Sequence, residues 1–216
     1  MDAFLDQLWI ARWAIAAGLV YTVEISLAAI LVGSLIGTFV GLGLTYGALP
    51  VRFVCRLYTD FVRGTPVLVL ILATFYMLAV VGMQLTAMQA GILALAVFCG
   101  AHVAEMLRGA LQAIPPGQTE AARSIGLTFR QIFVYVLAPQ ALRQVIPTWI
   151  NTAAELVKAS TLLSIIGVSE LLLVTQEVIS RNYLSLEFYG FAGLLYFLVN
   201  FAIERLGKAV DRRLAY

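Results

Sequence analysis

Charged residues are scarce in this chain of 216 residues. Asp, Glu, Lys and Arg together make up 12% of the sequence, and apolar residues make up 62%. Soluble domains are about 25% charged and about 45–50% apolar. A single small globule would have too little polar surface to cover so much apolar material. This composition therefore excludes an ordinary soluble domain and predicts an integral membrane protein.

Cysteine and histidine are also rare. Cys55 and Cys99 give no disulfide pattern, so we expect two free thiols. His102 is the only histidine in the sequence. One histidine is too few for the usual metal sites or for a convincing set of catalytic groups. We therefore expect that the chain is not an enzyme and binds no metal, and we keep an intramembrane enzyme as an alternative.

The apolar residues occur in long runs without strand-type alternation, which argues against a β-barrel. A helix that spans the hydrocarbon core needs about 20 such residues. The sequence predicts an all-α integral membrane protein with five transmembrane helices, forming a single domain over residues 1–216. The five predicted spans are residues 14–47, 66–81, 85–107, 148–174 and 188–203.

The basic residues predict the orientation of the chain. Short loops rich in Arg and Lys favour the cytoplasmic side of a membrane. Here they follow the first, third and fifth predicted spans, whereas Glu170 belongs to the more acidic opposite side. We therefore expect the N-terminus outside and the C-terminus in the cytoplasm. The net charge of +2 reflects this topology and does not suggest a nucleic-acid partner. The inner set is Arg52, Arg56, Arg63, Arg108, Arg123, Arg130, Arg143, Arg205, Lys208, Arg212 and Arg213.

Small residues recur every four positions in the first predicted span, at Ala29, Gly33, Gly37 and Gly41. This spacing places them on one helix face, where a second helix can approach closely. The partner helix belongs either to this chain or to a second copy.

One long polar insert, residues 115–139, separates the third and fourth predicted spans. The residues Pro115, Pro116 and Gly117 should end the preceding helix. Thr119 is a candidate N-cap for a short helix that begins at Glu120. Pro139 and Pro147 are expected to bracket the return into the membrane, so the insert should form a short helix, a bend and a second helix outside the bilayer. Before the second span, Thr65 is a candidate cap, with Pro66 at the first helical position.

With these residues the chain resembles the permease subunits of ATP-binding cassette (ABC) importers, and more narrowly the polar amino acid uptake group. The spacing of Glu120-Ala121-Ala122, Gly126 and Pro139 is similar to the loop signature of that family. Val136 and Ala138 replace its usual Ile and Leu, and Leu70, Ala159 and His102 are further departures. The other matching residues are Arg63, Gly64, Thr65, Pro66, Glu105, Arg108, Gly117, Gln118, Lys158, Ser160, Thr161, Leu162, Glu204 and Arg205.

The resemblance implies that the insert is a cytoplasmic coupling helix. Its contacts with an ATPase would be Glu120, Ala121, Ala122 and Gly126, with Arg123 or Arg130 at the polar rim and Pro139 at the end of the segment. The alternative is an amphipathic helix that rests on lipid headgroups. Such a helix would not need this spacing of glycine and proline.

The resemblance also implies partners and a location. Two permease subunits, identical or similar, would sit on an ABC ATPase dimer in the bacterial cytoplasmic (inner) membrane and receive solute from an extracytoplasmic binding protein. The sequence lacks a Gly-x-x-x-x-Gly-Lys-Ser/Thr phosphate loop. ATP and Mg²⁺ would therefore bind to the partner ATPase, and this chain would bind no cofactor. Alternatives are a permease for another small solute, or a channel not driven by ATP.

Two charges lie inside the fourth predicted span. Lys158 lies roughly midway through a core that is ~30 Å thick, and Glu155 shares its helix face. A charge at this depth costs at least ~2.5 kcal/mol and should face protein or water. In one interpretation Glu155 attracts an ammonium group, and Lys158, Ser160 or Thr161 a carboxylate, along a substrate path to which we add Thr65. In the other, Glu155 and Lys158 form an ion pair that only fixes packing.

Overall fold

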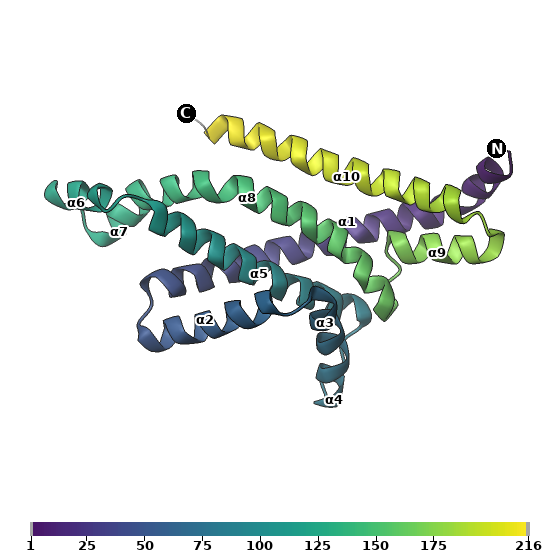
Figure 1. The fold of residues 1–216 in the computed structure, drawn as a ribbon, viewed down its shortest axis with the longest axis horizontal. Coiled ribbons are helices and arrows are strands. Elements are labelled where there is room, and N and C mark those ends of the chain that lie inside the picture. The colour runs from purple at the N-terminus through teal and green to yellow at the C-terminus, as the bar shows by residue number, and fades with distance from the viewer. Residues whose placement is uncertain (1, 215–216) are drawn as a thin grey trace.

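The computed structural model describes residues 2–214, with side chains described for residues 3–210, and these residues contain helices and no strand. The helices are joined by short turns (Figure 1). Their bounds are α1 (Asp2–Tyr46), α2 (Leu49–Gly64), α3 (Val67–Leu72), η1 (Ala73–Met77), α4 (Leu78–Val80), α5 (Ala87–Ala113), α6 (Pro116–Ser124), α7 (Phe129–Ile132), η2 (Phe133–Leu137), α8 (Ala138–Ala159), η3 (Ser160–Ile166), α9 (Leu171–Asn182) and α10 (Ser185–Leu214).

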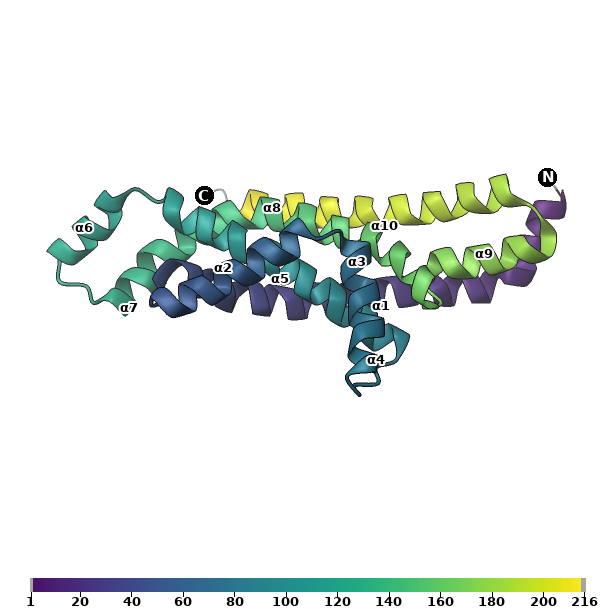
Figure 2. The ribbon, with the colours of Figure 1, turned by 60° about the horizontal axis from the view of Figure 1, so that its bottom comes forward.

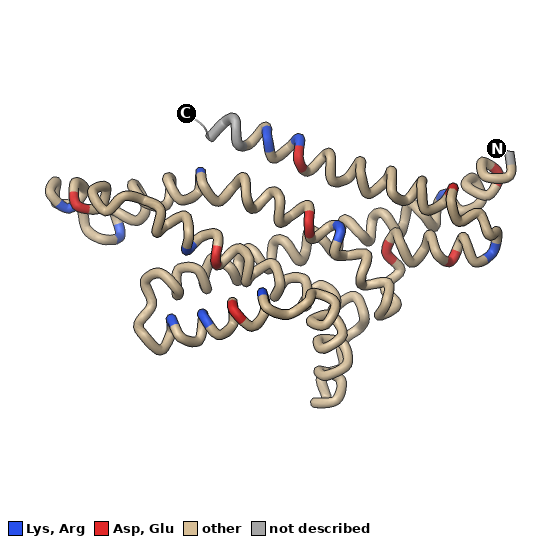
Figure 3. The backbone as a smooth tube through the Cα atoms, viewed as in Figure 1, with Lys and Arg blue, Asp and Glu red and all other residues tan. Residues whose placement is uncertain are grey.

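Four long helices, α1, α5, α8 and α10, run along the long axis of the molecule (Figures 1 and 2). α1 has 45 residues, which at ~1.5 Å per residue is about twice the thickness of a hydrocarbon core. It begins at Asp2, well before the predicted start of the first span. Charge is absent from α1 after Glu24, from α5 before Glu105 and from α10 between Glu187 and Glu204 (Figure 3).

α1 packs closely on α5, and the small residues explain how. A Cβ atom at Gly33 would lie 2.5 Å from Cys99 Cβ, and one at Gly37 would lie 2.5 Å from Val103 Cβ. Neither position has room for a side chain, so the glycines let the two backbones approach. The partner of the small-residue face is therefore a helix of the same chain.

The predicted second span differs from the structure. Residues 67–80 form α3, the π-helical turn η1 and α4, and this segment makes an angle of 111° with α2. Thr65 is the extended C-cap residue that follows α2, and its Oγ1 donates a hydrogen bond to Phe61 O at 2.8 Å, so it does not cap the next helix. Pro66, which lacks an N–H group, occupies the N-cap position of α3.

The predicted fourth span is also bent. The helix runs from Phe129 through Pro139 and Pro147 to Ile166, then turns by 52° into α9. Gly167 at the break has φ +82°, a left-handed conformation that favours glycine. Just before Pro139 the helix has a π-helical turn, in which Ala138 N–H donates to Phe133 O. Neither proline ends the helix, so the structure shows no helix break at the two positions that were expected to bracket the return into the membrane.

Three helices are long and apolar enough to cross a membrane by themselves: Ala3–Tyr46, Ala87–Ala113 and Ser185–Val210. The bent pairs Leu49–Gly64 with Val67–Val80, and Phe129–Ile166 with Leu171–Asn182, each pass the same test together. By length and composition, the described part of the chain therefore contains three candidate spans, or up to five if each bent pair is one span.

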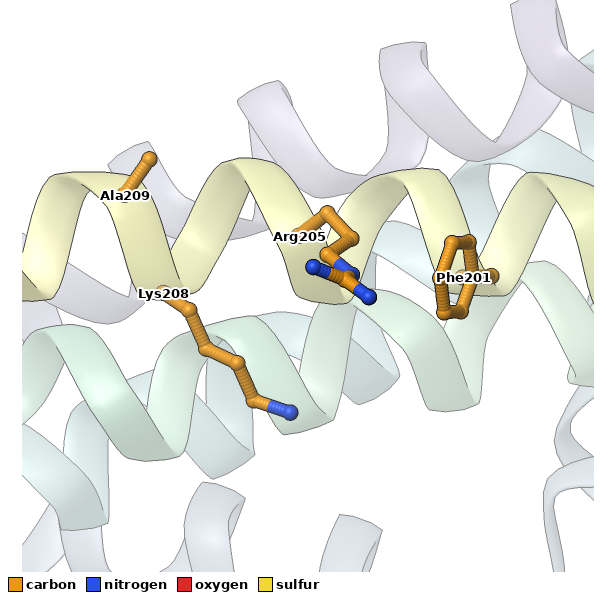
Figure 4. A pocket seen from close by; sticks show the side chains of 4 residues that line it. All are labelled: Phe201, Arg205, Lys208 and Ala209. Atoms are coloured by element: carbon orange, nitrogen blue, oxygen red, sulfur yellow. The ribbon is translucent and has the colours of Figure 1, made fainter.

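The last turns of α10 carry basic side chains. Arg205 and Lys208, with Phe201 and Ala209, line a surface pocket of about 320 Å³ (Figure 4). The guanidinium carbon of Arg205 lies 4.8 Å from the centre of the Phe201 ring, and Lys208 Nζ lies 3.7 Å from Glu204 Oε2. The side chains of Arg212 and Arg213, two further predicted inner residues, lie outside the described part.

Candidate functional site: the α6 segment and the exposed face of α8

The predicted coupling segment forms a helix that starts earlier than expected. α6 begins at Pro116, with Pro115 at the N-cap position, so Thr119 lies inside the helix and does not cap it. Proline is well suited to the first helical turn, where its missing N–H has no helical partner. Together with α7, this helix lies at the end of the molecule opposite the N-terminus (Figures 1 and 2).

Gly126 ends α6. Its N–H donates to Arg123 O at 2.9 Å, and Leu127 N–H donates to Ala122 O at 3.2 Å. These two bonds form a Schellman motif, which requires a left-handed residue, and Gly126 has φ +83°. Gly126 therefore stops the helix and turns the chain toward α7.

The side chains of α6 divide into one that points inward and several that face solvent. Ala122 is 5% exposed and packs in an apolar cluster with Ala110, Leu111, Ile132 and other residues of α5, η2 and α8. The remaining predicted contact residues are exposed: Glu120, Ala121, Arg123, Gly126 and Arg130. Ala122 thus anchors α6 to the rest of the protein, and the neighbouring side chains remain exposed at the surface.

An exposed apolar side chain in this segment escaped the sequence analysis. Ile125 is 77% exposed, between Ser124 and Gly126 at the end of α6. Phe129, at the start of α7, is 55% exposed, and its ring lies 5.3 Å from that of Tyr46 at the end of α1. The available signal for Ile125 was an apolar residue between Ser124 and the helix-ending Gly126.

Glu155 and Lys158 both lie exposed on α8. Within residues 3–210 the ion pairs join residues of α2, α5 and α10, and none involves α8. The predicted Glu155–Lys158 pair is therefore not formed. On another face of α8, Ile150, Ala153 and Val157 are buried and line a groove with α1 and α10. The two charges occupy a face of α8 that this chain leaves uncovered.

The hydroxyl residues of the predicted path are bonded locally. Ser160 is fully buried, and its Oγ donates to Val157 O at 2.8 Å. Thr161 is half-buried, and its Oγ1 donates to Lys158 O at 2.7 Å. Thr65 lies on a different element, at the end of α2. The structure therefore groups Glu155, Lys158 and Thr161, but turns the Ser160 side chain into the core.

A buried carboxylate at the opposite end was missed. Glu170, expected in an outer loop, is fully buried at the N-cap of α9. Its Oε1 accepts a bond from Leu173 N–H at 2.9 Å, and its Oε2 accepts one from Tyr196 O–H at 2.5 Å. Thr22 Oγ1 accepts from Leu171 N–H at 3.1 Å. The position of Glu170 directly before a leucine run was a helix-start signal that charge counting overlooked.

The chain is similar to known transport proteins along most of its length. The family model described as "Binding-protein-dependent transport system inner membrane component" matches residues 33–216. The L-cystine transport system permease protein TcyB of Bacillus subtilis is 30% identical over 204 residues, which cover 94% of this chain and 87% of that protein. The octopine transport system permease protein OccM of Rhizobium meliloti is 31% identical over 217 residues, with the same coverage of 94% and 87%.

A solved structure shares the fold. The chain superposes on one described as an amino acid ABC transporter with histidines, with a TM-score of 0.90, 33% identity and coverage of 97% of this chain and 98% of that chain. The family model alone covers well over half of the sequence. The chain therefore belongs to the family of inner-membrane components of binding-protein-dependent transport systems.

Proposed function

We propose that the chain is the permease subunit of an ATP-driven importer for a polar amino acid or a close derivative. The names of its relatives, which are transport permeases for cystine and octopine, support the solute class. A permease for another small solute of the same importer class is the alternative. The whole chain, residues 1–216, acts as one transmembrane domain and takes no catalytic role.

The observation that carries the proposal is the exposed α6 segment. A helix anchored through a single inward residue, Ala122, leaves Glu120, Ala121, Arg123 and Ile125 free for a partner. The segment from Pro115 to Pro139 then acts as the coupling region, with α6 docked on an ABC ATPase. That ATPase binds ATP and Mg²⁺, because this sequence has no phosphate loop.

The bent helix pairs count as single spans in this proposal, which gives five spans. The N-terminus then lies outside and the C-terminus in the cytoplasm, on the same side as α6. The remaining partners are a second permease subunit, identical or similar, an extracytoplasmic solute-binding protein and membrane lipid. Movement of the docked helices switches the spans between outward-facing and inward-facing packings.

The uncovered face of α8 lines the path in this proposal. Glu155 and Lys158 are exposed and unpaired with each other, so their charges are available to the ammonium and carboxylate groups of an amino acid. Thr161 and Thr65 belong to the same proposed set, whereas Ser160 contributes through packing. We expect Glu155→Gln to change the preference among cationic and neutral amino acids in an uptake competition. Unchanged preference in a normally assembled complex would contradict this assignment.

The experiment is reconstitution of the chain in proteoliposomes with an ABC ATPase and a solute-binding protein from the same organism. We expect ATP-dependent uptake of a labelled polar amino acid and ATP hydrolysis that rises when loaded binding protein is added. Omission of the binding protein is the control. Uptake without ATP would favour a channel, and failure of any ATPase to co-purify would contradict the importer.

A further inference from the structure

α2 and α5 are joined by an ionic cluster centred on Glu105. Arg108 Nη2 lies 2.7 Å from Glu105 Oε2, and Arg108 Nε donates to the same oxygen at 3.0 Å. Two arginines from α2 complete the cluster. Arg56 Nη1 lies 2.9 Å from Glu105 Oε1, and Arg63 Nη1 lies 3.9 Å from Oε2. One carboxylate thus holds three guanidinium groups from two helices.

The joint also has an apolar part on the same side of α2. Val62 is buried in a small cluster with Phe98 and Ala101 of α5. Tyr58 O–H donates to Val97 O at 2.7 Å. Apolar packing holds α2 against α5 around residues 97–101, and the Glu105 ion pairs hold the two helices together further along α5. The ionic cluster is therefore a separate attachment that acts through charge.

The cytoplasmic end of α5 contacts the coupling segment. Ala110 and Leu111 share an apolar cluster with Ala122 of α6. Glu105 precedes Ala110 by five residues, which is ~8 Å along a helix. A displacement of α6 that is passed to α5 at Ala110 therefore reaches the Glu105 cluster about one and a half helical turns away along α5. On the other side of the cluster, α2 leads through Gly64 to the 111° bend before α3.

We propose that Glu105 is the positioning residue that ties α2 to α5, so that movement of the coupling helix reaches the bent α2–α3 segment. The proposal rests on the proposed function, because it assigns α6 the docking role. Glu105 does not touch solute or ATP. It acts by holding Arg56 and Arg63 of α2 against α5, which contacts the coupling helix α6.

The energetics favour a role in coupling over a role in stability. The Glu105 side chain is only 12% exposed, but those of Arg56 and Arg63 are 44% exposed. Without the carboxylate, water can solvate these two guanidinium groups, and repulsion between them and the Arg108 guanidinium favours movement of α2 away from α5. The apolar contact at Val62 remains. The expected result is a loosened joint in a folded protein.

The test compares Glu105→Gln with wild type in the reconstituted complex, with solute transported per ATP hydrolysed as the readout. We expect this ratio to fall roughly fivefold or more, the lower range of coupling between two sites, while ATP hydrolysis continues. Glu204→Gln is the matched control, because Glu204 forms an exposed ion pair with Lys208 far from the joint. We expect it to leave the ratio unchanged. Equal ratios for Glu105→Gln and wild type would overturn the proposal, as would transport and hydrolysis falling in parallel.

Two more variants separate charge from folding. Glu105→Asp keeps the carboxylate, so the solute transported per ATP hydrolysed should stay close to the wild-type value. Arg56→Gln leaves the Arg108 contacts intact, so it provides the test if Glu105→Gln does not assemble, and it should lower the ratio in the same direction. A normal ratio in assembled Arg56→Gln together with Arg63→Gln would overturn the proposal.

A chemical link provides the rescue. Cysteines at positions 56 and 105, joined by a short bifunctional thiol reagent in a background where Cys55 and Cys99 are alanine, should restore the ratio lost in the unlinked form. No recovery after complete linking would contradict the tie between α2 and α5. Wild type reports separately on the proposed function: if it shows no ATP-dependent uptake, the importer assignment fails before Glu105 is considered.

Discussion

Glu105 and Glu170 are both enclosed carboxylates, at different levels of the molecule and with different partners. Glu105 is surrounded by Arg56, Arg63 and Arg108 and remains slightly exposed. Glu170 is fully buried, and its recorded bonds come from neutral donors, Tyr196 O–H and Leu173 N–H. Within residues 3–210 no Lys, Arg or His forms an ion pair with Glu170.

The same type of side chain is therefore used in two ways. At Glu170 the carboxylate satisfies buried donors and connects α9 to α10, so its removal leaves polar groups without partners. At Glu105 the partners reach water, so its removal loosens a contact between helices. We therefore expect Glu170 to govern stability and Glu105 to govern coupling.

The largest effect should come from Glu170→Ala. The Leu173 N–H and Tyr196 O–H groups would lose their acceptor, at about 1–3 kcal/mol for each unsatisfied donor. Unfolding in detergent micelles measures this loss of stability. Glu177→Ala is the control, because Glu177 is exposed on the same helix, and it should change stability by less than about 0.5 kcal/mol. Equal stability of the two variants would remove the distinction between the carboxylates.

An intermediate loss is expected for Gly37→Ala, in the contact of α1 with α5 near Glu105. The added Cβ would lie 2.5 Å from Val103 Cβ and 2.7 Å from Gly100 O. Overpacking of this kind costs about 1–3 kcal/mol. Gly193→Ala on α10, where nothing lies within 4 Å of the added atom, should instead gain up to about 1 kcal/mol from helix propensity. If both variants lose stability equally in thermal unfolding, the close packing of α1 on α5 is not the cause.

The smallest stability effect should come from Glu105→Gln, at about 1 kcal/mol or less, since partly exposed ion pairs contribute little. Raising the salt concentration should reduce the difference from wild type, because salt screens exposed charges. The effect of Glu170→Ala should change little with salt. The same unfolding assay at low and high salt measures both. A loss at Glu105 as large as that at Glu170 would contradict the comparison.

Local patterns in the sequence predicted much of this structure. The four-residue spacing of Gly33 and Gly37 predicted a close helix contact, which depends on short-range sterics. The polar insert was predicted to form a short helix, a bend and a second helix, and the structure has α6 and α7 there.

Features that depend on tertiary context were not predicted. Pro139 and Pro147 lie within a continuous helix. A π-helical turn precedes Pro139, which stands in the opening turn of α8, and Pro147 lies exposed inside α8. The partners of Glu170 come from α9 and α10, and those of Glu105 from α2 and α5. No local pattern specifies contacts between segments so far apart in the chain.

The most direct test concerns the surface of α6. Cysteines placed one at a time at positions 121, 122 and 125, with Cys55 and Cys99 replaced, would be labelled with a membrane-impermeant thiol reagent in inverted membrane vesicles with and without the ATPase. The account predicts that positions 121 and 125 react rapidly in the free permease and are protected by the ATPase, whereas the buried position 122 reacts slowly in both states. Equal labelling of 121 and 125 with and without the ATPase would contradict the docking role of α6.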